Sequence, residues 1–166
     1  LTARYDTLGI VMDNVGKNAG YSSKQMAEYQ NALQKTGISM ISARTTMAKM
    51  AQAQIDLSKS SDLARVAQDA AVIGNINSSE AFERMIQGIQ SAEVEILRNI
   101  GINVSFEESY KELAAQLKKN VADLSVQEKT QARVNSVLKA GAGIQGTYAA
   151  SMNSAGKQWL SLQRYV

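Results

Sequence analysis

Residues 77–89 read NSSEAFERMIQGI, and this stretch decides the fold class of the chain. Asn77 followed three residues later by Glu80 is a capping pair, because the Asn oxygen can accept an N–H of the first helical turn. The large apolar residues behind it are Phe82, Met85, Ile86 and Ile89. They recur at spacings of three and four residues, so the stretch predicts an amphipathic helix with one buried face.

The same pattern recurs along the whole chain. Further capping pairs are Ser22 with Gln25, Ser105 with Glu108 and Ser125 with Glu128. Helix ends are predicted at glycines, which adopt the left-handed conformation without strain, and at one asparagine. These residues are Gly16, Gly20, Gly37, Gly74, Gly101 and Asn120. Because signals for strands are nearly absent, we expect an all-α protein, an irregular multi-helix bundle of about seven to nine short capped helices with a C-terminal helical arm.

Apolar residues inside the predicted helices form stripes that should face the core. Ile41, Ala48 and Ile55 share one face of the third helix, and the stripe of the fourth helix runs from Leu63 to Ile73. Methionines at helical spacing are interpreted as core residues and not as a ligand set, because Met fits irregular gaps.

Glycines divide the chain into two parts. Residues 1–140 are expected to form a compact helical domain, and residues 141–166 a Gly-rich break followed by the helical arm. The glycines of the break are Gly141, Gly143 and Gly146. Each costs about 1 kcal/mol relative to Ala inside a helix, which favours an interruption. Because the sequence starts at Leu1 and stops within an amphipathic run, we interpret it as a piece of a longer chain.

The arm carries an apolar stripe along one side. Its members are Tyr148, Met152, Trp159, Leu162 and Val166. A short helix with one apolar side is marginal in water, so the stripe needs a cover. Two alternatives are open: the stripe packs back on the same chain, or it associates with a second copy or another protein.

The residue types that the chain lacks narrow its possible functions. It contains no His, the commonest general base and transition-metal ligand, and no Cys for thiolate sites or disulfides. We therefore expect that the protein is not an enzyme. No run of about 18 apolar residues occurs, so no membrane-spanning segment is expected.

Two patterns are similar to chemical sites. Glu108 and Glu112 share one helix face, as a metal site or an acid–base pair would require; the alternative is an exposed face with local ion pairs such as Glu107 with Lys111. Residues 141–146 read GAGIQG, a G-x-G-x-x-G pattern. Dinucleotide binding by this pattern requires a strand before it and an acidic residue after it, and this sequence predicts no such strand and has no such acidic residue. We expect no catalytic, cofactor-binding or metal site, and no cofactor.

The net charge of +3 is unevenly distributed along the chain. All 15 acidic residues lie at or before Glu128, and the residues beyond it carry only basic charges. These basic residues are Lys129, Arg133, Lys139, Lys157 and Arg164. The alternatives are a solvated helix face and a surface that meets nucleic acid or an acidic partner. The charges are too sparse to favour the second, so we expect no sequence-specific nucleic-acid binding.

Several segments, taken together, resemble a known family. They are residues 69–71 (DAA), 79–91 (SEAFERMIQGIQS), 97–102 (LRNIGI), 124–138 (LSVQEKTQARVNSVL) and 143–159 (GIQGTYAASMNSAGKQW). In this order they are similar to the globular region of bacteriophage or prophage tail tape measure proteins. The resemblance extends from about Gly37 to Trp159. One departure is Lys118, at a position where Gly is frequent in the family.

The resemblance implies a structural role. Tape measure proteins are long, mostly helical chains that lie along the lumen of the growing tail tube, and their length sets tail length. They contact tail chaperones, tail tip proteins and tube subunits, and they leave the tube before the genome passes. Such a protein is made in the bacterial cytoplasm and located in the virion tail. The alternative is a non-enzymatic cytoplasmic helical adaptor or interaction module, which the length of the parent chain would distinguish.

Overall fold

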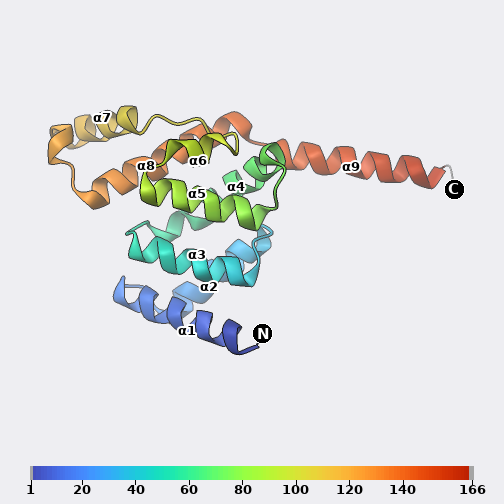
Figure 1. The fold of residues 1–166 in the computed structure, drawn as a ribbon, viewed down its shortest axis with the longest axis horizontal. Helices are drawn as coiled ribbons and strands as arrows, with labels where there is room; N and C mark the ends of the chain where they lie inside the picture. The colour runs from blue at the N-terminus through green and yellow to red at the C-terminus, as the bar shows by residue number, and fades with distance from the viewer. Residues whose placement is uncertain (1, 165–166) are drawn as a thin grey trace.

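The protein is all-α, as the sequence predicts (Figure 1). The computed structural model describes the backbone of residues 2–164 and the side chains of residues 2–155. Within these residues the helices are α1 Thr2–Asn18, α2 Ser23–Lys35, α3 Met40–Gln52, α4 Ser60–Gly74, α5 Ser78–Ser91, α6 Val94–Arg98, α7 Phe106–Leu117, α8 Val126–Gly141 and α9 Thr147–Arg164. Short 3₁₀ turns lie at η1 Leu57–Lys59, η2 Val121–Asp123 and η3 Ala142–Ile144. No strand occurs in the described part of the chain.

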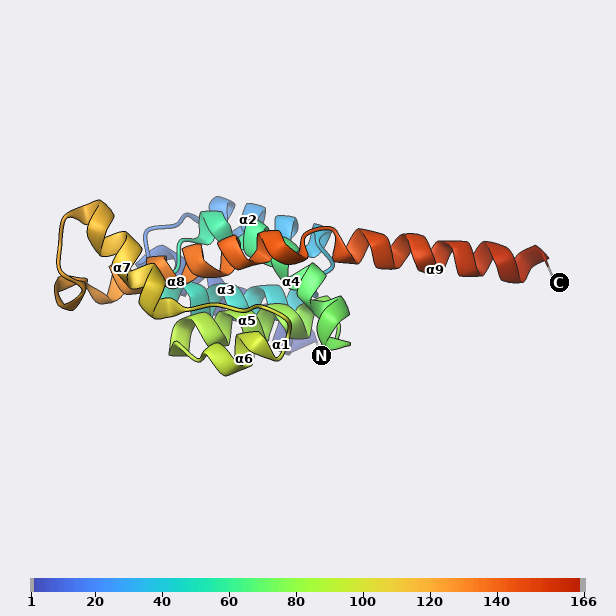
Figure 2. The same ribbon diagram turned by 90° about the horizontal axis from the view of Figure 1, so that it is seen from above.

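The helices of the body are stacked, and the last helix projects from it (Figures 1 and 2). Helix α3 packs between α1 and α5, and α4 packs on α5, α2 and α8. Helix α8 also packs against α7 and α5, so it joins the two sides of the body. Helix α9 contacts α4 and then extends away from the bundle.

Most of the predicted helix starts are confirmed. Ser22 and Ser125 each form a complete capping box, in which the hydroxyl and the side chain three residues later bond each other's backbone N–H. The oxygen of Asn77 accepts the N–H of Glu80 at 2.8 Å. The predicted cap at Ser105 is wrong in one respect, since Ser105 occupies the cap position of α7 but its side chain makes no capping hydrogen bond.

Helix ends follow the glycines only in part. Gly20, Gly37 and Gly101 have positive φ, as predicted. Helix α1 continues through Gly16 to Asn18, because Gly16 lets α2 approach: a Cβ there would lie 2.6 Å from the sulfur of Met26.

Two further predicted helix ends need correction. Helix α4 does end at Gly74, but it is Asn75, with φ 53°, that takes the left-handed conformation. Helix α7 ends at Leu117, where Lys118 takes the left-handed conformation with φ 55°, and not at Asn120. This turn is thus made without Gly.

The core consists mainly of Ala, Met, Leu, Ile and Val side chains, together with Phe82 and Phe106. Met26, Met47, Met50 and Met85 are completely buried. Two predicted stripe members need correction. Ile55 is buried but lies in the turn after α3, because that helix ends at Gln52. Ile73 is 47% exposed, at the end of the stripe of α4.

Candidate functional site

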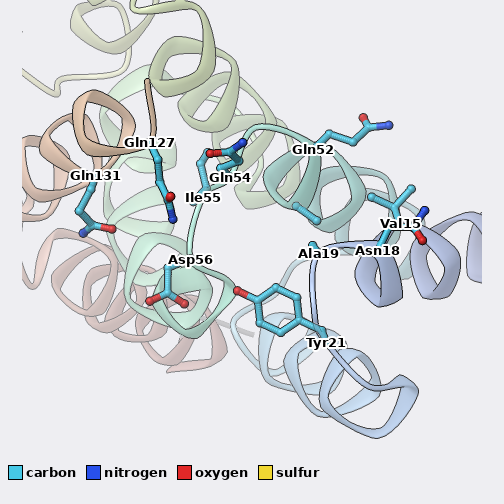
Figure 3. Close-up of a pocket in the computed structure, with 11 residues that line it drawn as sticks. Val15, Asn18, Ala19, Tyr21, Gln52, Gln54, Ile55, Asp56, Gln127 and Gln131 are labelled. Atoms are coloured by element: carbon cyan, nitrogen blue, oxygen red, sulfur yellow. The ribbon is translucent and has the colours of Figure 1, made fainter. Parts of the chain in front are cut away.

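One cleft lies where three parts of the chain meet (Figure 3). Its volume is about 710 Å³. The α1–α2 connection, the turn between α3 and η1, and the first turns of α8 line it. Its polar side chains include Tyr21, Gln54, Asp56, Gln127 and Gln131. Side chains of Asp56, Gln127 and Gln131 are grouped on one side of the opening, with Tyr21 across from them (Figure 3).

A left-handed turn after α3 places the acidic group at the cleft. Gln54 has φ 61°, and the N–H of Ile55 donates to the carbonyl of Met50 at 2.8 Å. This hydrogen bond closes the helix C-terminus and directs Ile55 into the core. The following residue, Asp56, is consequently exposed at the rim.

Several cleft side chains already make hydrogen bonds. Asp56 Oδ1 accepts the N–H of Ser58 at 2.9 Å, and the hydroxyl oxygen of Tyr21 accepts the N–H of Leu57 at 3.2 Å. The Nε2 group of Gln131 donates to Asn135 at 2.9 Å. The oxygens of Asp56 and Gln131 therefore keep capacity to accept further hydrogen bonds.

The cleft is negatively charged. Asp56 is its one charged lining residue, and it forms no ion pair with any residue whose side chain the structure describes. Burial raises the pKa of the Tyr29 phenol, and the neighbouring Tyr21 and Asp56 raise it further. The rings of Tyr21 and Tyr29 meet edge to face, with centroids 5.9 Å apart.

The acidic pair of the sequence is separated into two ion pairs. Glu108 lies 3.8 Å from Lys111, and Glu112 lies 3.5 Å from Lys139 of α8. Among the described residues Lys111 pairs with Glu108 and not with Glu107, so the predicted Glu107–Lys111 ion pair is not formed. All four paired side chains are more than half exposed, so these contacts are surface ion pairs of small energy. No group of three or more acidic, His or Cys side chains able to hold a metal occurs among the residues described.

The G-x-G-x-x-G stretch forms a connection between helices. Gly141 is the last residue of α8 and packs on α4, where a Cβ would lie 2.4 Å from a methyl group of Val66. Gly146 has φ 89° and precedes α9. The stretch thus turns the chain between two helices and follows no strand of the described chain.

Arg133 is the residue that sequence reasoning placed wrongly. It was expected on a solvated helix face, but it is buried and donates hydrogen bonds to Ile89 O, Tyr110 Oη at 2.9 Å and Thr130 Oγ1 at 3.2 Å. Lys129 lies over the ring of Tyr110, 5.8 Å from its centroid. Of the basic residues of α8, Arg133 is therefore used inside the body.

The arm is anchored at its first turn. The N–H of Tyr148 donates to Asp69 Oδ1 of α4 at 2.9 Å, so Asp69 serves as a cap for α9 from another helix. Met152 is 53% exposed. The side chains of the other predicted stripe members, Trp159, Leu162 and Val166, lie outside the described residues.

Comparison of the chain with protein-family models, with curated proteins and with solved structures found no match. Among the helices described, none has both the length and the apolar character needed to cross a membrane.

Proposed function

We propose that this chain is a module of a phage or prophage tail tape measure protein, a structural component that takes part in setting tail length, in tail assembly and in genome delivery. The proposal rests on the resemblance of five segments and on how those segments pack. In the fold they lie in α4, α5, α6, α8 and α9 with the turns beside them. The protein has no catalytic role in this proposal.

The observation that carries the proposal is that the resembling segments meet through the very residues that make them distinctive. Arg133 of the segment 124–138 donates to the carbonyl of Ile89 in the segment 79–91. Gly88 of that same segment lies against Leu97 of the next, where a Cβ would be 2.8 Å from the Leu side chain.

The first and last segments also meet. Asp69 of the segment DAA caps the arm through the N–H of Tyr148. Common helical phrases that resembled the family by chance would not need to place these residues at contacts between segments. The packing therefore supports reading the five segments as one unit.

In this proposal the body docks and the arm continues the chain. The partners are tail tube subunits, tail chaperones or tail tip proteins, and a second copy of the chain through Tyr148, Met152, Trp159 and Leu162. Tyr148 is half-buried at the base of the arm and Met152 is exposed, so at least part of this stripe is open to a partner. The protein is made in the bacterial cytoplasm and acts in the lumen of the virion tail.

Tail length in the phage or prophage that encodes the chain tests the proposal. An extended helix adds about 1.5 Å of length per residue, so a ruler segment shortens the tail in proportion to a deletion. Because this module is folded into a body, we expect an in-frame deletion of residues 2–141 from the parent gene to block tail formation without giving proportionally shorter tails. Electron microscopy of induced lysates measures both. Normal tails in normal number would overturn the proposal.

Self-association is tested separately. Sedimentation of the full chain should show a second copy bound at high concentration, and truncation after Gly146 should leave a folded monomer. A large loss of thermal stability on truncation would show instead that the stripe packs back on the body. A full chain that stays monomeric over a wide concentration range would exclude association through this stripe.

A further inference from the structure

We propose that the cleft beside Asp56 binds an extended polypeptide segment of a partner protein, and that a Lys or Arg side chain of this segment pairs with Asp56. This inference concerns a different surface from the arm and does not depend on the identity of the parent protein. Three properties of the cleft support this inference. They are the charge and the free hydrogen-bond acceptors of its lining, the amide side chains in the lining, and the size of the cleft.

The lining offers acceptors where a cation would lie. Asp56 carries the one charge of the lining, and one of its two carboxylate oxygens has no hydrogen-bond partner among the described residues. Gln131 uses its NH₂ group on Asn135, which leaves its carbonyl oxygen for the cleft. Tyr21 uses an acceptor site on Leu57 and keeps its O–H as a donor. An ammonium or guanidinium group has only donors and therefore matches Asp56 and Gln131 together.

The amides extend the match from a cation to a peptide. Gln54 and Gln127 also line the cleft, and their side chains carry the same donors and acceptors as the peptide backbone. Amide groups can bind a peptide main chain whatever the charge of its side chains, whereas Asp56 selects a basic side chain. A volume of about 710 Å³ exceeds what one Lys tip fills and lies within the range of ligand pockets, roughly 300–1,000 Å³.

The same lining disfavours other ligands. It contains no Lys or Arg, so a phosphate or a carboxylate would meet no opposite charge there. It also contains few large apolar side chains, since Val15 and Ile55 are the members of that kind and Ile55 is buried in the core. An apolar helix face would therefore bury little surface in this cleft.

Titration of the labelled full chain with short synthetic peptides, followed by NMR, tests the inference. The probe is a peptide of alternating Gly and Ser with one central Lys; a second carries Arg and a third carries Glu. We expect the Lys and Arg peptides to shift the backbone signals of Gln54, Asp56 and Gln131, and the Glu peptide to shift none of them. If neither basic peptide moves these signals at the highest soluble concentration, the inference is wrong.

A matched pair of variants locates the charge. Asp56→Asn retains an oxygen for the N–H of Ser58, so the fold should persist, and we expect it to weaken binding of the basic peptides about tenfold, or about 1.4 kcal/mol. Asp62→Asn removes an exposed carboxylate of α4 that pairs with Arg65 outside the cleft, and we expect it to leave the affinity unchanged. Equal affinity in the chain with Asp56→Asn and in the unmodified chain would overturn the pairing with Asp56. Gln131→Ala is a second test, because removal of the Gln131 amide should weaken binding of the basic peptides without changing the net charge of the protein.

Discussion

The carbonyl oxygen of Ile89, in the last turn of α5, accepts a hydrogen bond from the guanidinium of Arg133, 44 residues later in the chain. The carbonyls of a last helical turn have no partner within their own helix, and a cation near them also interacts favourably with the helix dipole. Arg133 thus needs no carboxylate: it replaces the missing helical donor and at the same time binds Tyr110 of α7.

Arg133→Met should therefore lower the free energy of unfolding by about 2–4 kcal/mol, since buried polar groups left without a partner cost about 1–3 kcal/mol each. Met approximates the length of the Arg side chain but donates nothing. Urea denaturation measures the loss. The control is Lys129→Met, which removes a cation from the face of Tyr110 at the protein surface and should cost less than about 1 kcal/mol. Equal effects of the two substitutions would contradict a structural role for the buried network.

The two serine caps should differ. Ser125→Ala removes the hydroxyl of a complete capping box and should cost about 0.5–2 kcal/mol. Ser105→Ala should change the stability by no more than about 0.5 kcal/mol, because the side chain of Ser105 makes no capping bond. Chemical denaturation of both variants tests this difference. A loss at Ser105 as large as at Ser125 would show that α7 is capped in solution by the hydroxyl.

Two nearby glycines should respond in opposite ways to a methyl group. Gly141→Ala places a Cβ 2.4 Å from a methyl group of Val66, so we expect a loss of about 1–3 kcal/mol from overpacking. Gly143→Ala meets nothing within 4 Å and should leave stability unchanged or raise it by up to about 1 kcal/mol. Thermal melts report both. When Gly141→Ala is combined with Val66→Ala, the loss of stability should be smaller than the sum of the losses in the two single variants. Strict additivity of the two losses would argue against the contact between Gly141 and Val66.

The order of the arm should depend on Asp69. Asp69→Ala removes the acceptor of the Tyr148 N–H, and we expect the first turn of α9 to loosen. Trp159 is the one Trp of the chain, so its fluorescence anisotropy reports the motion of the arm. The anisotropy should fall in Asp69→Ala and stay unchanged in Asp62→Ala, which removes a carboxylate that pairs with exposed Arg65 on the same helix. The same fall in both variants would mean that Asp69 does not hold the arm.

Much of this fold is local in origin and could be predicted. The capping pairs at Ser22, Asn77 and Ser125 act within one turn, so their residues alone determine where those helices begin. The ends of helices were harder to predict from the sequence. Gly16 and Gly141 are small because a neighbouring helix packs closely against each of them, and not because a turn requires Gly there. Pattern alone cannot distinguish these two uses of Gly.

The sequence-based predictions that were wrong or missing concern features that depend on contacts between residues far apart in the chain. The burial of Arg133 depends on an unpaired carbonyl in another helix, which no pattern near residue 133 encodes. The cleft depends on three segments that meet only in the folded chain, so its residues showed no common motif. Asp69 was noticed only as part of a resembling segment, and its use as a cap for a helix 79 residues away is a tertiary property.

The arm also determines how the protein would carry mechanical load. Helix α9 has 18 residues and is therefore about 27 Å long, so a rotation of about 10° at its base displaces its far end by about 5 Å. Tension applied along the chain at that end enters the bundle at the Gly146 turn and, through the Asp69–Tyr148 hydrogen bond, at α4. We expect these two connections to yield first under an axial pull, while the helices that bury Phe82 and Arg133 remain packed.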